Sequence, residues 1–470
     1  MNQPIQALTS LKRPLPAAMH DALKTRFGDQ FSTTQAVRDH HGRDESSYPL
    51  TAPEAVVFAR HADDIVAVVD LCRTHRYPLI PFGAGSSLEG HYLAILGGVC
   101  LDVSQMNKVL AINPEDLTAT VQPGVTRKQL NAELAGTGLF FPIDPGADAS
   151  LGGMSATRAS GTNAVRYGTM RENVLSLTVV TAQGKVIKTA QRAKKSSAGY
   201  DLTRLFVGSE GTLGVIAEVT VKLYPLPEAI SAAMVSFDTA HNAITAVIQT
   251  IQMGIPVARC EFLCENAIRA INAHSHLGLS ERPTLLFEFH GSEAGVKEQA
   301  ETVEAITSDN GGKDFEWATK PEDRTRLWTA RHNFYFAGLQ IKPGYRAIST
   351  DTCVPISRLA ESLVGAQEIL KDWPHPSPIV GHVGDGNFHA LILVNPDDAD
   401  ETARAELLNE KIVRLALSMQ GTCTGEHGIG LHKMDYLVEE LGDDAVDLMR
   451  SLKRTFDPDN ILNPGKIVRL

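Results

Sequence analysis

Two histidines and a glutamate lie in glycine-rich surroundings in the last part of the 470-residue chain. His382 and His389 are seven residues apart, and Glu426 is followed directly by His427. Two imidazoles and one carboxylate form the ligand set of a catalytic metal site, which keeps one coordination position open for substrate. The pattern predicts metal-assisted chemistry on an oxygen-bearing substrate, with His427 beside the ligands to take a proton.

Each of these side chains also has a simpler interpretation. Taken singly, His382 and His389 fit buried structural histidines, and a purely structural metal would more often show four protein ligands with cysteine among them. Asp385 and Asn387 lie at the same turn. They could support the ligands, contact a substrate or only form the turn.

A second candidate site lies at Trp328, Arg331 and Tyr335, which are three and four residues apart. Residues at this spacing share one face of a helix. An arginine between aromatic side chains suits a substrate carboxylate held by two parallel hydrogen bonds. The same residues also fit an amphipathic helix whose arginine reaches solvent, and both interpretations stay open.

Three turns rich in glycine and serine occur in the first half of the chain. The sequence Gly83-Ala84-Gly85-Ser86-Ser87 follows a predicted strand, so its backbone N–H groups could bind an anion. It matches neither the dinucleotide nor the P-loop fingerprint, and alone it fits a tight turn. Together with the long small-residue loop 145–168 and the turn 208–214, it predicts a cradle for an elongated nucleotide cofactor.

Composition limits the class of protein. Apolar content of 43% and charged content of 21% are ordinary for a soluble globular protein, and a net charge of −11 argues against nucleic acid as a partner. The six dispersed cysteines contain no C-x-x-C pair, which favours reduced thiols. No apolar run approaches membrane-spanning length. We expect a cytoplasmic protein, with peripheral association at the inner membrane and a homodimer left open.

Hydrophobic periodicity predicts a mixture of helices and strands in both halves of the chain. The fold class is therefore α+β, and Pro225 and Pro227 mark a domain boundary. The predicted parts are an N-terminal helical segment (1–45), a first domain (46–228), a second domain (229–420) and a C-terminal segment (421–470) that packs back on the first domain.

Read together, these motifs carry a family resemblance. Segments 81–90, 145–168 and 206–216 resemble the FAD-binding domain of the vanillyl-alcohol oxidase/PCMH flavoprotein superfamily. Segments 327–333, 349–355, 381–389, 421–430 and 463–466 are similar to the FAD-linked oxidase C-terminal domain. The resemblance implies a PCMH-type FAD-binding domain followed by an α+β substrate domain built on an antiparallel sheet. Within the superfamily it is nearest to the D-lactate dehydrogenase (cytochrome) group.

The resemblance also implies roles for individual residues. His382, His389 and Glu426 would bind a divalent metal (zinc, with manganese as the alternative), and His427 would be the catalytic base. Arg331 would bind the substrate carboxylate, with Trp328, Tyr335 and Asn387 beside it. Ser86 stands where members with covalent flavin often have histidine, so we expect non-covalent FAD. The residues expected along FAD are Pro81, Gly83, Ala84, Gly85, Ser86, Ser87, Gly90, Pro145, Gly146, Ser150, Gly153, Gly161, Glu210, Gly211, Ile216 and Asn463.

The implied activity is oxidation of a D-2-hydroxy acid, and the favoured reaction is D-lactate to pyruvate. Hydride passes to FAD, and the electrons go on to cytochrome c, a quinone or an electron-transfer flavoprotein. Relatives acting on D-2-hydroxyglutarate have a lysine where this chain has Ser349, which favours a monocarboxylate, although Arg346 could substitute.

Other functions stay open at this point. D-2-hydroxyglutarate dehydrogenase and a glycolate oxidase flavin subunit are the alternatives within the family. A non-catalytic flavin-binding subunit and a metallohydrolase are alternatives of other classes, and the metallohydrolase would leave the nucleotide cradle unexplained.

Overall fold

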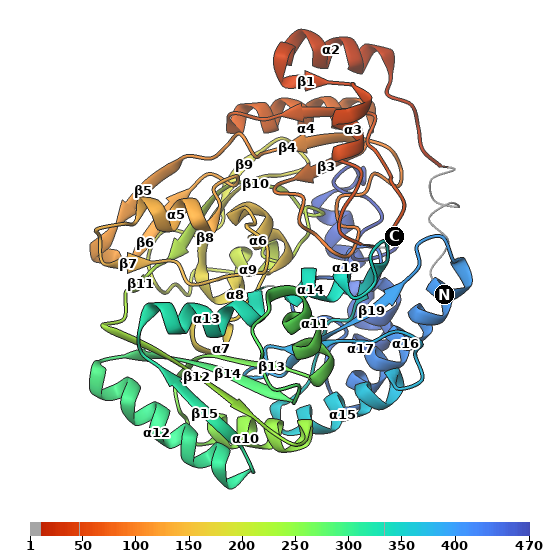
Figure 1. The fold of residues 1–470 in the computed structure, drawn as a ribbon. Coiled ribbons are helices and arrows are strands. Elements are labelled where there is room, and N and C mark those ends of the chain that lie inside the picture. Colours follow the sequence, from red (N-terminus) through yellow and green to blue (C-terminus); the bar gives the residue numbers. More distant parts are fainter. Residues whose placement is uncertain (1–10, 47, 333) are drawn as a thin grey trace. The chain divides into compact units, whose positions relative to one another are not determined.

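The computed structural model describes residues 11–46, 48–332 and 334–470, and its elements are labelled in Figure 1. The chain divides into two compact units. Unit 1 comprises the chain through Ser160 together with Thr169–Leu226 and Glu426–Leu470, and unit 2 comprises Gly161–Gly168 and Pro227–Gly425. Residues 11–45, part of the N-terminal segment that we expected to be separate, belong to unit 1. The short segment 161–168, expected in the first domain, belongs to unit 2.

In the described part of unit 1 the strands form three sheets. A four-stranded sheet has the order β1-β2-β4-β3, with β2, β4 and β3 parallel, and a five-stranded antiparallel sheet has the order β5-β6-β10-β8-β9. A short pair joins β7 and β11. The strands are β1 (Phe31–Ser32), β2 (Ala55–Phe58), β3 (Leu79–Phe82), β4 (Val99–Asp102), β5 (Val109–Asn113), β6 (Thr118–Val121), β7 (Leu139–Phe140), β8 (Val174–Val180), β9 (Val186–Lys188), β10 (Val215–Lys222) and β11 (Tyr224–Pro225).

The helices of unit 1 pack apolar stripes against these sheets. In α4, Ile65, Val68, Val69 and Cys72 are buried at the helical spacing that the sequence predicts. The helices are α2 (Ala17–Phe27), α3 (Gln35–His40), α4 (Ala62–His75), α5 (Arg127–Glu133), α6 (Leu151–Thr157), α8 (Met170–Asn173), α9 (Leu202–Phe206), α17 (Met434–Leu441) and α18 (Asp443–Phe456), with 3₁₀ turns η1 (Gly28–Gln30) and η2 (Pro114–Asp116).

Helix α6 corrects the prediction of an irregular loop over 145–168. Ser150 caps this helix by accepting a hydrogen bond from the Gly153 N–H. A Cβ on Gly152 would lie 2.5 Å from the Pro123 side chain, so glycine lets the helix pack closely. Its small residues therefore serve a close helix contact, which the composition alone made look like loop.

Unit 2 is built on one eight-stranded sheet in its described residues. The order is β15-β12-β14-β13-β18-β19-β16, with β17 also paired to β19, and every pair is antiparallel as predicted. The strands are β12 (Ala229–Ser236), β13 (Val257–Leu263), β14 (Thr284–Gly291), β15 (Lys313–Ala318), β16 (Arg346–Ser349), β17 (Thr352–Cys353), β18 (Ile379–Gly381) and β19 (Asn387–Val394).

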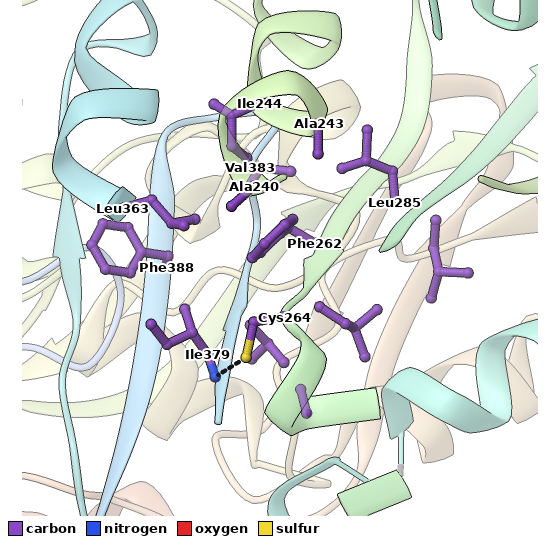
Figure 2. Packing of buried hydrophobic residues seen from close by; sticks show 14 of the residues in the cluster. Ala240, Ala243, Ile244, Phe262, Cys264, Leu285, Leu363, Ile379, Val383 and Phe388 are labelled. Atoms are coloured by element: carbon purple, nitrogen blue, oxygen red, sulfur yellow. Dashed lines mark hydrogen bonds between the residues drawn. The ribbon is translucent and has the colours of Figure 1, made fainter. Parts of the chain in front are cut away.

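One face of this sheet is apolar and packs against helices. Phe262 on β13 and Phe388 on β19 lie with Ala243 and Ile244 of α10 and Leu363 of α15 in a single buried cluster (Figure 2). The helices of unit 2 are α7 (Ala164–Tyr167), α10 (Ala240–Gln252), α11 (Glu265–Ser275), α12 (Glu293–Asp309), α13 (Pro321–His332), α14 (Phe334–Gln340), α15 (Leu359–Leu370) and α16 (Ala399–Ser418), with the 3₁₀ turn η3 (Ile356–Arg358).

The opposite face of the same sheet is polar. Because side chains alternate along a strand, Arg259 and Glu261 on β13 point away from Phe262. Glu288 on β14 pairs with Arg259 in register. Directly paired residues on neighbouring strands point to the same face of a sheet. His389 pairs with Val380, and Val380 pairs with Leu263, which is two residues after Glu261, so His389 shares the face of Glu261. The sheet therefore gathers ionisable side chains from strands far apart in sequence on one surface.

Candidate functional site

The three Gly/Ser-rich turns meet within unit 1. The Gly208 N–H donates to the Ser155 carbonyl at 2.9 Å, which joins the third turn to α6. A Cβ on Gly83 would lie 2.5 Å from Ser150 Oγ, so only glycine allows the first turn to approach α6 this closely. Gly211 packs in the same way on Pro81. The three turns therefore lie together in unit 1, and their role as a cofactor cradle stays a prediction.

This cradle fits a nucleotide cofactor. Its first turn is partly exposed, and a Cβ on Gly146 would meet nothing within 4 Å, so backbone there is open to a ligand. Ser150 and Gly153 place small groups beside Gly83. Backbone amides lined by small side chains are what a diphosphate and a flat ring require.

Two predicted cofactor residues form hydrogen bonds with backbone groups of the protein. Glu210 accepts the N–H groups of Ile429 at 2.8 Å and Gly430 at 2.9 Å. Asn463 donates to the carbonyls of His91 at 2.9 Å and Glu210 at 2.8 Å. These side chains tie the C-terminal segment to the third turn, and their contact with FAD stays a prediction.

Other predicted cofactor residues differ in their surroundings. Gly161 belongs to unit 2, and its place beside FAD stays a prediction. Gly90 is buried, and its N–H donates to Asp44 at 2.8 Å. Ile216 is buried in the core of unit 1. The turn 83–87 and the stretch 145–153 remain the part of the predicted cradle that is open to a ligand.

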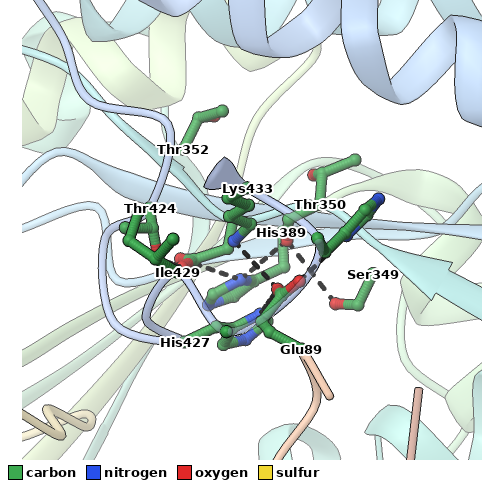
Figure 3. A network of polar contacts seen from close by, with 12 residues as sticks. Glu89, Ser349, Thr350, Thr352, His389, Thr424, His427, Ile429 and Lys433 are labelled. Atoms are coloured by element: carbon green, nitrogen blue, oxygen red, sulfur yellow. Dashed lines mark hydrogen bonds and ion pairs between the residues drawn. The ribbon is translucent and has the colours of Figure 1, made fainter. Parts of the chain in front are cut away.

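A buried carboxylate in unit 1 fixes the predicted base. Glu89, 1% exposed, contacts His427 Nδ1 at 3.3 Å, His432 Nδ1 at 2.9 Å and Lys433 Nζ at 2.9 Å (Figure 3). Burial alone would raise the pKa of Glu89, but Lys433 and the two histidines outweigh it and hold that pKa well below its usual range.

The protonation of His427 follows from this contact. Because a carboxylate only accepts hydrogen bonds, the proton of neutral His427 lies on Nδ1. Its lone pair is then on Nε2, the form that a general base needs. Glu89 was missed in the sequence, where it reads as one more residue of the first turn.

In unit 2 a second buried carboxylate joins two predicted site residues. Glu261, fully buried, contacts His382 Nδ1 at 2.7 Å through one oxygen and accepts from Arg331 Nε at 2.6 Å through the other. Burial would raise the pKa of Glu261, but His382 and Arg331 hold it below the usual value. The carboxylate therefore fixes the His382 proton on Nδ1, which leaves the Nε2 lone pair for a metal.

His389 is fixed in the same way. Its Nδ1 lies 3.1 Å from the Thr350 carbonyl, which only accepts, so this ring also carries its proton on Nδ1. The centroids of the His382 and His389 rings are 5.4 Å apart, and their planes are inclined by 81°. Two neighbouring imidazoles that both offer Nε2 are a donor set suited to a divalent metal.

The loop between the two histidines is set by backbone geometry. Gly386 has φ +90°, and a Cβ there would lie 2.2 Å from the Val354 carbonyl. The turn that brings His382 and His389 together thus depends on glycine at this position. Asn387 follows it at the start of β19.

Asp351 organises the surroundings of Asn387. It is fully buried and accepts from Asn387 Nδ2 at 2.9 Å and from Thr424 Oγ1 at 2.7 Å. The Gly425 N–H donates to the Asp351 carbonyl at 3.3 Å. Asn387 Oδ1 is a buried acceptor without a hydrogen-bond partner among the described residues, which suits a donor on a ligand.

The remaining predicted substrate residues, Trp328 and Tyr335, lie on different helices. Trp328 on α13 is 4% exposed and packs in the core, with the Arg259 guanidinium 4.8 Å from its ring centroid. Tyr335 lies on α14 and packs against the same core. Trp328 is thus buried beside Arg259, on the side of the sheet where Arg331 contacts Glu261, and its role at the substrate stays a prediction. Asn333, part of the matching segment, is outside the described residues.

Comparison with known proteins identifies the class. The sequence matches the family of FAD linked oxidases, C-terminal domain, over residues 226–467 and the FAD binding domain family over residues 53–190. The chain belongs to the FAD-linked oxidase family. It is an FAD-linked oxidoreductase with a PCMH-type FAD-binding unit.

Particular relatives narrow the comparison. The chain is 51% identical to a probable mitochondrial D-lactate dehydrogenase of Danio rerio, over 94% of this chain and 90% of the relative. It is 45% identical to the mitochondrial D-lactate dehydrogenase [cytochrome] of Arabidopsis thaliana, over 97% and 81%. It is 35% identical to the glycolate oxidase subunit GlcD of Bacillus subtilis, over 93% and 94%.

Solved structures share the fold at low identity. A 4-ethylphenol oxidase of Gulosibacter chungangensis is similar with a TM-score of 0.81 and 17% identity, over 97% of this chain and 98% of that one. A p-cresol methylhydroxylase has a TM-score of 0.80, again at 17% identity and the same coverage. None of the helices in the described part of the chain has the length and apolarity that a membrane crossing requires.

Proposed function

We propose that this protein is an FAD- and metal-dependent dehydrogenase that oxidises a D-2-hydroxy acid, with D-lactate as the foremost substrate and pyruvate as its product. The observation that carries the proposal is the pair His382 and His389, whose Nδ1 atoms contact the Glu261 carboxylate and the Thr350 carbonyl, the kind of outer partner that orients histidine ligands of a metal. The names of the Danio and Arabidopsis relatives support D-lactate.

The third metal ligand is Glu426. This ligand is taken from the family resemblance, which matches segment 421–430. Two imidazoles with one carboxylate suit zinc, and manganese is the alternative. Such a metal, when bound, makes an alcohol more acidic.

The protein's own residues supply the rest of the chemistry. His427, with its proton on Nδ1, accepts the hydroxyl proton of the substrate at Nε2. Arg331 binds the substrate carboxylate through its outer nitrogens, because its Nε is used by Glu261. Asn387 offers the oxygen of its amide to the substrate. FAD, held non-covalently at the turn 83–87 and the stretch 145–153, is the hydride acceptor.

The sheet geometry favours a substrate with a single carboxylate. Ser349 pairs with Leu391 and so lies on the face that carries His389, whereas Arg346 pairs with Val394 on the other face and is exposed. A cation for a second carboxylate is therefore missing from the position that Arg346 could have filled. This supports D-lactate over D-2-hydroxyglutarate.

The electron acceptor and the location remain part of the proposal. The word cytochrome in the name of the Arabidopsis relative supports cytochrome c, with a quinone or an electron-transfer flavoprotein as alternatives. The names of the Danio and Arabidopsis relatives place those proteins in mitochondria, so the cytoplasmic location expected from the sequence stays a prediction.

The test is the visible spectrum of the purified yellow protein during anaerobic addition of substrate. We expect D-lactate to bleach the flavin rapidly, and L-lactate, glycolate and D-2-hydroxyglutarate to bleach it much more slowly. If glycolate or D-2-hydroxyglutarate bleaches the flavin fastest, that compound replaces D-lactate as the assigned substrate. A flavin that none of them bleaches would contradict the proposed activity and favour a non-catalytic flavin subunit.

A further inference from the structure

Two buried glutamates occupy equivalent situations on the polar face of the unit 2 sheet. Glu261 on β13 holds Arg331 at 2.6 Å and His382 at 2.7 Å. Glu288 on the neighbouring strand β14 lies 3.4 Å from Arg259 and 2.9 Å from His290. Each carboxylate thus bridges one guanidinium and one imidazole.

The two histidines differ at the ring nitrogen that does not face the glutamate. His290 Nδ1 lies 2.7 Å from the hydroxyl of Tyr167, a group that can either donate or accept a hydrogen bond. In the proposed function, the far nitrogen of His382 binds a metal, which requires a lone pair and tolerates no proton.

We propose that Glu261 is a positioning residue that dictates the tautomer of His382 and thereby controls metal binding. This inference rests on the proposed function, because it takes His382 as a ligand. The carboxylate accepts from both neighbours at once, so Arg331 keeps its orientation and His382 keeps its proton on Nδ1. Mutating a residue that hydrogen-bonds to a metal-binding histidine commonly lowers metal affinity about 10- to 100-fold.

Replacing the carboxylate by an amide makes the inference testable. Glu261→Gln has one accepting oxygen and one donating NH₂ group. Arg331 only donates, so the amide oxygen turns toward it and the NH₂ group faces His382. His382 must then accept at Nδ1, its proton moves to Nε2, and that nitrogen can no longer bind a metal.

The same reasoning gives a matched control and a rescue. In Glu288→Gln the proton of His290 also moves, but the Tyr167 hydroxyl turns to accept it, so nothing is lost at the metal. In the double variant Glu261→Gln with Arg331→Met, the amide is no longer held by a cation. It can rotate its oxygen toward His382 and restore the proton to Nδ1.

The experiment is titration of the chelator-treated flavoprotein with Zn²⁺, followed by calorimetry, with flavin absorbance and unfolding temperature recorded for every variant. We expect Glu261→Gln to weaken Zn²⁺ binding about 10- to 100-fold. Glu288→Gln should stay within about threefold of wild type, and the double variant should recover most of the affinity that Glu261→Gln loses.

The outcomes separate the inference from the proposed function. Wild-type affinity in Glu261→Gln, or a double variant no better than Glu261→Gln, would overturn the role of Glu261 while leaving the metal site standing. A wild-type flavoprotein that binds no Zn²⁺ or Mn²⁺ would overturn the metal site and the inference together. Recovery in the double variant also shows that loss in Glu261→Gln is not a folding defect.

Discussion

The two units differ in the cations that they bury. Unit 1 buries lysines: Lys433, Lys453 and Lys466 are at most 5% exposed and lie in the C-terminal segment. Both units bury carboxylates, Glu210 and Asp457 among those of unit 1. In unit 2 the fully buried Glu261 and Asp351 lie beside the polar face of the sheet, and none of its described lysines is buried.

The partners of these charges explain the difference. Lys453 donates to the carbonyls of Thr212 at 2.8 Å and Leu462 at 2.7 Å, and Lys466 donates to the Leu93 carbonyl at 2.8 Å. These lysines tie the C-terminal segment to the nucleotide cradle. The buried carboxylates of unit 2 instead orient side chains that would meet substrate or metal. Buried cations in this protein thus serve assembly, and the buried anions of unit 2 serve the chemistry.

Glu89 is a buried carboxylate of unit 1 that orients His427. The largest effect is therefore expected from His427→Gln, which should lower kcat about 10²- to 10⁴-fold by removing the base. Flavin content and metal content should stay as in wild type. His432→Gln is the matched control, since His432 contacts the same carboxylate at 2.9 Å. Equal losses of kcat in the two variants would contradict the role of His427.

Lys453→Met tests the assembly role of the buried lysines. The substitution leaves Asp457, which lies 2.5 Å from Lys453 Nζ, as a buried charge without its cation. Removing one partner of a buried ion pair costs about 3–5 kcal/mol, so urea denaturation should show a loss of that size in the free energy of unfolding. Lys371→Met, at an exposed pair, should unfold as wild type does. An unchanged free energy of unfolding in Lys453→Met would contradict the assembly role of the buried lysines.

Arg331→Met tests the chemical role of the charges in unit 2. A hydrogen bond to a charged group contributes about 1.5–3 kcal/mol, so the KM for D-lactate should rise about 10- to 150-fold. Arg326→Met on the same helix is the control, because Arg326 pairs with exposed Glu316. Steady-state kinetics distinguishes the two variants, and an unchanged KM in Arg331→Met would remove this residue from substrate binding.

The smallest effect concerns pH and Lys466. Burial lowers the pKa of Lys466 to about 7, below its ordinary value of 10.5. Between those values the unfolded chain binds more protons than the folded protein, so the contribution of Lys466 to stability rises as pH increases. The unfolding free energy of wild type relative to Lys466→Met should therefore rise from pH 7 to pH 9. A difference that stays constant or falls would contradict the buried, weakly basic lysine.

The sequence predicted local features better than distant pairings. The alternation of Phe287 and Phe289 with Glu288 and His290 marks a strand with one apolar and one polar face, and the three glycine-rich turns met as expected. Glu261 gave no such signal, because its partners are 70 and 121 residues away. Periodicity reports which face a residue occupies and says nothing about which distant charge will share it.

Two further misses have local causes. The small residues of α6 looked like a loop because close packing on Pro123 and flexibility leave the same composition. Glu89 was hidden inside a turn whose glycines drew the interpretation toward phosphate binding.

The most direct test of the account is anaerobic stopped-flow reduction of the flavin by D-lactate, before and after removal of metal by a chelator and after addition of Zn²⁺ or Mn²⁺. We predict fast reduction in the untreated protein, loss of most of the rate with flavin retained after chelation, and recovery on metal addition. Reduction at an unchanged rate in protein shown to be free of metal would contradict the assignment of His382, His389 and Glu426 as a catalytic metal site.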